Sequence, residues 1–179
     1  PELSEKLGVI RTQELLAARR IDGGRQFFSK AIDFGYSKKA SETFDVWGKD
    51  RILADVVEAF RSFQPDIVIN RFDHRSRGKT HGHHTASAIL SEEAFRISAD
   101  KDQFPDQLNE FSTWQPKRQF FNTSWWFYGS REAFENADMS DFLKFDIGSY
   151  FPLRGLSTNE IAAVSRSQHK SQGFGNISD

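Results

Sequence analysis

The sequence has 179 residues, a net charge of -1 at pH 7 and an aromatic content of 14 % that includes 18 Phe. This length fits one domain spanning 1–179, and this aromatic content excludes an intrinsically disordered chain. Lys and Arg are spread along the chain instead of forming a basic block, so we expect no nucleic-acid partner. No apolar run reaches the roughly 18 residues that a membrane span needs, and the compartment stays open between cytoplasmic and periplasmic or secreted.

The first part of the chain predicts two helices and two strands, the second of them buried. Apolar residues recur at helical spacing over 2–20, where we expect a helix with a break near Gly8. Residues 25–38 are rich in aromatic side chains without a helical period, which predicts a short strand followed by a loop. An amphipathic helix is expected over 49–63. The apolar run 66–70 predicts a strand buried on both faces of a parallel sheet.

A polar loop and another helix, expected over 85–99, follow that strand. This order of elements is typical of α/β proteins, so we expect a largely parallel sheet flanked by helices. In such sheets ligands bind outside the carboxyl ends of the strands. The loop is therefore where we expect the functional site.

The second part of the chain predicts short strands and a final helix. The strands are expected at 117–122, 124–129 and 142–148. The helix is expected over 158–172, because Ser157 and Glu160 match a capping box at its start.

Three of the five histidines lie within four positions at the junction of the loop and the helix: His81, His83 and His84. His81 and His84 are three residues apart, so their side chains can share one site on the first helical turn. The chain has no Cys, so any metal must be held by His and carboxylates. A catalytic zinc usually has three protein ligands, and it also needs a base and an oxyanion stabiliser. A solvated histidine-rich loop without metal is the alternative.

Five segments of the sequence resemble one known family. They are LGVIRTQELLAARRIDGG, DFGYSK, RSFQPDIVINRF, THGHHTASAIL and GLSTNEIAAVSRSQHKSQGFG. The family is that of the PIG-L/LmbE-like zinc-dependent de-N-acetylases, in the bacterial branch that deacetylates sugar derivatives. The resemblance implies a Rossmann-like layered fold, one divalent zinc ion and hydrolysis of an N-acetylated sugar or glycoconjugate.

The resemblance also implies roles for the three histidines. His84 would be the zinc ligand, and His81 would be the protonated imidazole that stabilises the tetrahedral intermediate. His83 stands where the family commonly has an Asp, whose contact could orient a ligand, so the role of His83 stays open.

Three further residues match the family's substrate pocket. Arg11 matches an arginine that faces the substrate, and its alternative is a surface residue paired with Glu14. Asp33 would line the same pocket, and its alternative is a turn Asp. His169 would lie near the mouth of the site, and its alternative is a residue near a helix C-terminus.

The family's Ala-His-Pro-Asp-Asp-Glu motif, which supplies its other metal ligands and its base, is missing from this sequence, which contains no Asp-Asp pair. We therefore expect the 179 residues to be a piece of a longer protein that lacks the first strand. The alternative is a member of the family that has lost its activity. Zinc binding by this chain alone is expected to be weak or absent. If the chain bound zinc tightly, Asp73 and His74 would be the next ligand candidates.

Three functions follow from these observations. The first is a zinc-dependent de-N-acetylase whose complete site needs upstream residues. The second is a non-catalytic carbohydrate-binding or interaction module in which Trp125, Trp126 and Tyr128 stack on sugars. The third is a metal-dependent amidase with a non-sugar substrate. The acyl sugar, the oligomeric state, any additional domains and the physiological metal stay open.

Overall fold

The computed structural model describes residues 5–75 and 80–173, which form two compact units. The terminal unit consists of the described residues of Pro1–Phe27 and Asp138–Asp179, and the central unit is Phe28–Ala137. Positions 2–4 of the first expected helix and 76–79 of the expected loop lie outside the described residues. The chain is mixed α/β, as predicted, and its organisation as one domain stays a prediction.

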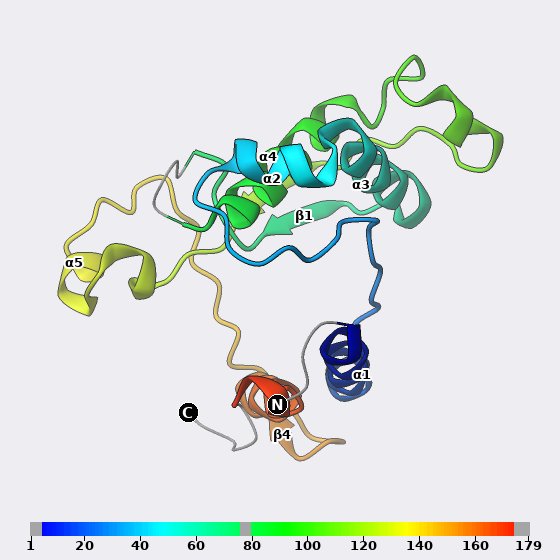
Figure 1. Ribbon diagram of the computed structural model, residues 1–179. Helices are drawn as coiled ribbons and strands as arrows, with labels where there is room; N and C mark the ends of the chain where they lie inside the picture. The colour runs from blue at the N-terminus through cyan, green and yellow to red at the C-terminus, as the bar shows by residue number, and fades with distance from the viewer. Residues whose placement is uncertain (1–4, 76–79, 174–179) are drawn as a thin grey trace. The chain divides into compact units, whose positions relative to one another are not determined.

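The central unit places helices beside a pair of parallel strands. Its elements are α2 (Ala40–Trp47), α3 (Lys49–Phe63), β1 (Ile67–Asn70), α4 (Gly82–Ile97), η1 (Pro105–Asn109), β2 (Arg118–Phe121), η2 (Trp125–Tyr128) and α5 (Arg131–Glu135). The register of β1 and β2 runs from Ile67 opposite Arg118 to Asn70 opposite Phe121. Figure 1 shows α2, α3 and α4 on one side of this strand pair. The parallel pairing confirms the expected parallel sheet for the strand at 66–70, and the short strand expected at 117–122 is its partner.

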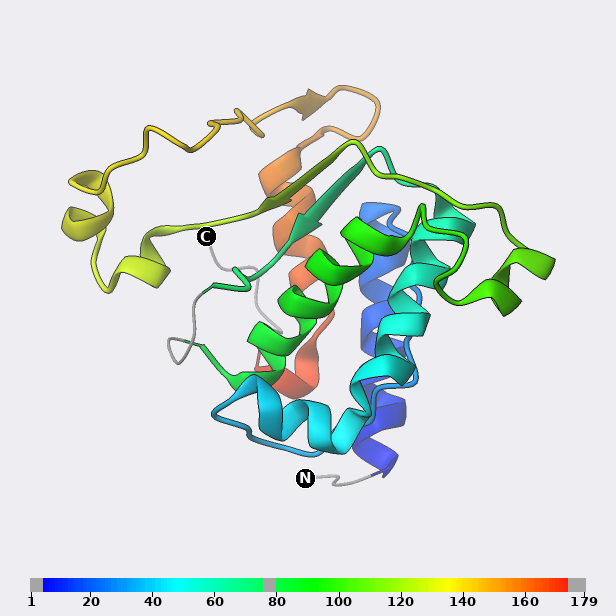
Figure 2. The same cartoon turned by 90° about the horizontal axis from the view of Figure 1, so that it is seen from above.

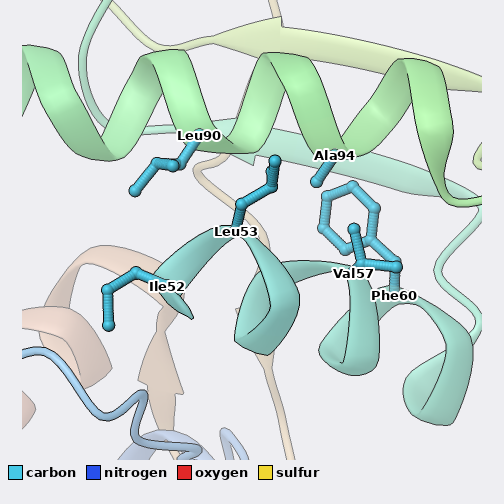
Figure 3. Packing of buried hydrophobic residues seen from close by; sticks show 6 residues of the cluster. All are labelled: Ile52, Leu53, Val57, Phe60, Leu90 and Ala94. Atoms are coloured by element: carbon cyan, nitrogen blue, oxygen red, sulfur yellow. The ribbon is translucent and has the colours of Figure 1, made fainter. Parts of the chain in front are cut away.

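The core of the central unit lies between α3 and α4, which run side by side in Figure 2. Helix α3 begins and ends where its apolar spacing predicts. Figure 3 shows Leu53, Val57 and Phe60 of α3 pointing toward α4, where Leu90 and Ala94 complete the cluster. Burial of each large apolar side chain stabilises the fold by about 1.5–3 kcal/mol. This contact fixes the position of α4, and α4 carries the histidines.

A buried arginine holds the segment after α4 against α3. Arg61 is 1 % exposed, and its guanidinium donates five hydrogen bonds at 2.8–3.1 Å. The acceptors are the backbone oxygens of Ser98, Asp100, Gln103 and Phe104 and Oε1 of Gln107. Burial lowers the pKa of Arg61 below its ordinary value. The carbonyl groups of an irregular segment need such partners, because neither a helix nor a sheet provides them.

Strand β1 is not buried on both faces, which corrects the prediction for 66–70. Ile67 and Ile69 are 54 % and 67 % exposed, whereas Val68 packs against the core cluster. Val68 packs against the cluster formed by residues of α3 and α4, so these helices cover the face of β1 that carries it. The continuous apolar run 66–70 therefore predicted the strand correctly but predicted its burial wrongly.

No strand forms over 25–38, so this part of the prediction is wrong, although the loop is present. Side chains of the neighbouring helices satisfy the backbone there. Lys30 N donates to Oδ2 of Asp55 at 2.6 Å, and Trp47 Nε1 donates to the Ile32 carbonyl at 2.9 Å. The short helix α2 that follows was not predicted.

Two of the later strand predictions are also wrong. Residues 125–128 form the 3-10 helix η2, in which Phe127 N donates to the Ser124 carbonyl at 3.1 Å. Residues 142–148 form no strand, and Asp146 instead accepts a turn hydrogen bond from Gly148 N at 2.8 Å. Both segments contain aromatic and branched side chains, which favour strands. Among the described residues, however, neither segment has a partner strand.

The terminal unit packs α1 against α6. Its elements are α1 (Glu5–Asp22), β3 (Tyr150–Phe151), β4 (Leu156–Ser157), α6 (Thr158–Arg166) and η3 (Lys170–Gln172), with β3 and β4 antiparallel. Helix α1 continues through Gly8, so the expected break is wrong. The capping box of Ser157 and Glu160 is confirmed, but α6 ends at Arg166 and a 3-10 turn replaces its expected last part. No helix in the described part of the chain has the length and apolar content that crossing a membrane requires.

Candidate metal centre

The three clustered histidines meet at the start of α4, which begins at Gly82, three residues before the predicted position. His81 is the N-cap residue, and His83 and His84 lie in the first turn. Each of the three offers a ring nitrogen, and these nitrogens lie within 4.8 Å of one another. The rings of His81 and His84 are stacked with centroids 4.9 Å apart, and the ring of His83 stands edge-on to His84 at 4.5 Å.

A glycine lets the start of α4 approach the loop before α2. Gly82 N donates to the Ser37 carbonyl at 2.8 Å. A Cβ at this position would lie 2.3 Å from the carbonyl oxygen of Lys39, a distance that no side chain tolerates. Glycine is therefore required here, and it holds His81 and His83 close to the loop.

Ser37 in the same loop also holds His83. Ser37 is 2 % exposed, and its Oγ accepts a hydrogen bond from His83 N at 3.1 Å and lies 3.5 Å from His83 Nδ1. The same Oγ is 2.9 Å from Oγ1 of the buried Thr43. Sequence reasoning missed Ser37, although it lies within the DFGYSK segment that carries the resemblance.

His84 is the most enclosed of the three imidazoles. Its ring lies flat on Phe72, with centroids 3.9 Å and planes 6° apart. Burial, followed by the positive charge on His83, His81 and Arg71, lowers the pKa of His84 from 6.5 to about 4. At neutral pH the ring of His84 is uncharged, which is the form that binds a metal.

The pKa of His83 is also lowered. Burial and the neighbouring His81 lower the pKa of His83, and the carboxylate of Asp33 opposes that effect. Asp33 is therefore near enough to influence the cluster. Its side chain is exposed and accepts a turn hydrogen bond from Gly35 N at 3.3 Å, the arrangement expected of a turn Asp.

The three imidazoles fit a divalent metal ion. Imidazole nitrogen donors suit zinc and also copper, nickel or iron, so the donor set does not identify the metal. Within 5–75 and 80–173, no carboxylate joins these histidines in a group of ligand atoms. Asp73 and His74 are outside the group, and Asp73 instead contacts Arg75 at 3.0 Å and His74 at 3.6 Å.

The other two predicted site residues, Arg11 and His169, belong to the terminal unit, where both influence Glu14. The carboxylate of Glu14 accepts hydrogen bonds from N and Oγ of Ser171, each at 2.7 Å. These bonds, and after them the positive charges of His169 and Arg11, lower the pKa of Glu14. The expected role of Arg11 and His169 in binding substrate stays a prediction.

No known protein family, curated protein or solved structure matches the chain. The resemblance to the PIG-L/LmbE-like de-N-acetylases therefore rests on the sequence segments alone.

Proposed function

We propose that this chain carries part of the metal site of a zinc-dependent hydrolase that removes the acetyl group from an N-acetylated sugar or glycoconjugate. The single observation that carries the proposal is the convergence of three imidazole nitrogens within 4.8 Å at the start of α4. The site follows a strand of a parallel pair, as the ligand sites of open α/β sheets do. The proposal includes the Rossmann-like layered fold that the resemblance implies.

The three histidines take different parts in this proposal. His84 holds the metal, because its ring is neutral at pH 7 and oriented by Phe72. A zinc ion held there supplies Lewis-acid chemistry at the acetamide carbonyl. His81 is the most exposed of the three, and as an imidazolium it donates a hydrogen bond to the developing oxyanion. His83, held by Ser37 and with its ring edge-on to that of His84, adds a second nitrogen donor.

Full turnover requires a base that takes a proton from the attacking water. The resembled family takes this base and further ligands from the Ala-His-Pro-Asp-Asp-Glu motif, which is missing here. We therefore expect efficient hydrolysis only from a protein that supplies those groups, and metal binding to be the property of this chain that is accessible by itself.

The test measures acetate release from a panel of N-acetyl sugars by a protein that contains this chain together with those groups, with and without a chelator. The proposal expects release that the chelator abolishes. It expects His81→Ala to lower kcat by about 100-fold or more while the metal stays bound. Metal-independent release, or no release from any member of the panel, would overturn it. A panel of N-acyl amino acids separates a sugar deacetylase from an amidase with a non-sugar substrate.

A second candidate function is a carbohydrate-binding module, and the exposure of two tryptophans favours it. Trp126 and Trp125 of η2 are 63 % and 43 % exposed, and Arg131 lies 5.6 Å from the ring of Trp125. Exposed indole faces stack on sugar rings. Tyr128 contributes less, because its ring packs on Phe134 at 5.1 Å. Glycan titrations that change Trp fluorescence in the chain but not in Trp126→Ala would support this function.

A further inference from the structure

The carboxyl ends of the two parallel strands carry a pair of polar side chains that the proposed function leaves unused. Arg71 directly follows β1, and Asn122 directly follows β2. Nη1 of Arg71 donates to Oδ1 of Asn122 at 2.9 Å, so the pair joins the ends of the two strands. Both residues belong to the central unit, which also carries the histidine cluster. Ligands of open α/β sheets bind at this end of the strands.

The guanidinium of Arg71 is held against two aromatic rings. It lies 5.5 Å from the centroid of the Phe72 ring and 5.1 Å from the centroid of the Phe127 ring. A cation over the face of a ring is attracted to it, so these contacts favour one position of a long and flexible side chain. A ligand that binds to Arg71 therefore has less side-chain freedom to remove.

Arg71 and Asn122 both keep hydrogen-bond donors that a ligand can use. Both side chains are exposed, and within 5–75 and 80–173 the one acceptor of the Arg71 guanidinium is Oδ1 of Asn122. In the same part of the chain no carboxylate forms an ion pair with Arg71, since Asp73 contacts Arg75 instead. Nε and Nη2 of Arg71 and Nδ2 of Asn122 are therefore the donors that remain among the described residues.

Phe72 connects this pair of residues to the candidate metal centre. The ring that the Arg71 guanidinium contacts also stacks on His84, with centroids 3.9 Å apart. The charge of Arg71 is near enough to contribute to the lowered pKa of His84. A positive charge beside a metal ligand disfavours metal binding, because like charges repel. Metal binding therefore does not account for Arg71, whereas an anionic group on the substrate does.

We propose that Arg71 and Asn122 bind an oxyanion group, a carboxylate or a phosphate, of the N-acetylated sugar whose acetamide lies at the metal centre. Nε and Nη2 form one edge of the guanidinium fork and donate two parallel hydrogen bonds to two oxygens of such a group. Nδ2 of Asn122 adds a third donor. This inference rests on the proposed function and narrows its substrate to acidic N-acetyl sugars.

The test is an NMR titration of the chain, with and without zinc, with three sugars: neutral N-acetylglucosamine, N-acetylmuramic acid, which carries a carboxylate, and N-acetylglucosamine 6-phosphate. At least one acidic sugar should bind about tenfold more tightly than the neutral sugar, because it adds hydrogen bonds to a charged group. The acidic sugar that binds more tightly identifies the oxyanion. The preference should persist without zinc, so equal affinities for all three sugars overturn this inference, whereas a chain that binds no zinc contradicts the proposed function.

Variants of Arg71 locate the preference. Arg71→Gln should remove it without weakening the binding of N-acetylglucosamine or of zinc, which a merely structural role would not predict. Arg71→Lys should recover part of it, because the charge is kept and the fork is lost. Arg75→Gln is the matched control, since Arg75 also lies over an aromatic ring, 5.7 Å from Phe121, but is paired with Asp73. This control should keep the full preference.

A variant of Asn122 separates ligand binding from support of the fold. Asn122→Asp keeps an acceptor for Nη1 of Arg71, so the ends of the two strands stay joined. The new carboxylate compensates the charge of Arg71, and the preference for the acidic sugar should be lost. Circular dichroism checks that each variant is folded. A preference that both Arg71→Gln and Asn122→Asp leave unchanged overturns the inference.

Discussion

The imidazole of His84 lies flat on the ring of Phe72, with centroids 3.9 Å apart and planes 6° apart. Phe72 comes two residues after β1, and His84 lies in the first turn of α4. The stack therefore joins the end of the strand to the start of the helix. It also covers one face of the imidazole, which contributes to the burial that keeps His84 uncharged.

Replacement of Phe72 tests this contact. Phe72→Leu should raise the pKa of His84 from about 4 toward 6.5, because water gains access to the charged imidazole. The free energy of unfolding should fall by about 1 kcal/mol, the usual contribution of an aromatic pair. An NMR titration of the His84 ring and urea unfolding measure the two effects. Phe134→Leu is the control, since Phe134 packs on Tyr128, and an unchanged His84 pKa in Phe72→Leu would contradict the account.

The lowered pKa values of His83 and His84 predict how stability depends on pH. In the unfolded chain both side chains take up protons below about pH 6.5, whereas in the folded chain His84 stays neutral down to about 4. The unfolded state therefore binds more protons over this range. The free energy of unfolding should be constant above about pH 6.5 with respect to these groups and should fall as the pH drops toward 4.

Carboxylates such as Asp22 and Glu160 also have lowered pKa values, so their protonation in acid also lowers the free energy of unfolding. The relevant quantity is therefore the difference between the chain and His84→Phe, measured as urea midpoints from pH 7 to pH 4.5. The variant keeps an aromatic ring on Phe72 and cannot be protonated. Its stability should depend less steeply on pH, and parallel curves would show that His84 does not titrate as described.

Two glycine variants should change stability in opposite directions. Gly82→Ala places a Cβ 2.3 Å from the Lys39 carbonyl, so we expect the free energy of unfolding to fall by about 3 kcal/mol or more. Gly8→Ala meets no atom within 4 Å inside α1 and should raise it by about 0.5–1 kcal/mol. Urea unfolding of both variants provides the comparison. Equal effects would mean that the start of α4 is not packed against the loop.

Loss of Arg61 should be among the most damaging single changes in the central unit. Arg61→Met removes five hydrogen bonds and leaves buried carbonyls without donors, so the free energy of unfolding should fall by about 3 kcal/mol or more. Arg61→Lys should recover little, because an ammonium has only three donors. Arg51→Met, on the exposed face of the same helix, should cost less than about 1 kcal/mol. Similar losses in Arg61→Met and Arg51→Met would contradict the role given to Arg61.

The sequence predicted those elements whose pattern is complete within one segment. Helix α3 has an apolar stripe over its whole length, and its bounds were predicted as Lys49–Phe63. The strands β1 and β2 were also located. The strand predicted over 25–38 failed because aromatic content does not show where backbone groups find partners, and Asp55 and Trp47 provide them there.

The same distinction applies to the candidate site. The spacing of His81 and His84 predicts that they share one turn of a helix, and the structure brings their rings to 4.9 Å. The contact of His83 with Ser37 joins residues 46 positions apart, and no periodic pattern in the sequence predicts such a pair. The number of imidazoles available to one metal ion therefore became visible only in the folded chain.

The central claim is that the histidine cluster at the start of α4 binds one metal ion and that His84 is a ligand. The most direct test is a zinc titration of this 179-residue chain against a chromophoric chelator, beside His84→Phe and His74→Ala. His84→Phe removes a ligand and keeps an aromatic ring on Phe72, whereas His74 lies outside the cluster. We predict one equivalent of zinc for the chain and for His74→Ala, held less tightly than in a closed four-ligand site, and none for His84→Phe. No zinc bound by the chain, or equal binding in His84→Phe, would contradict the claim.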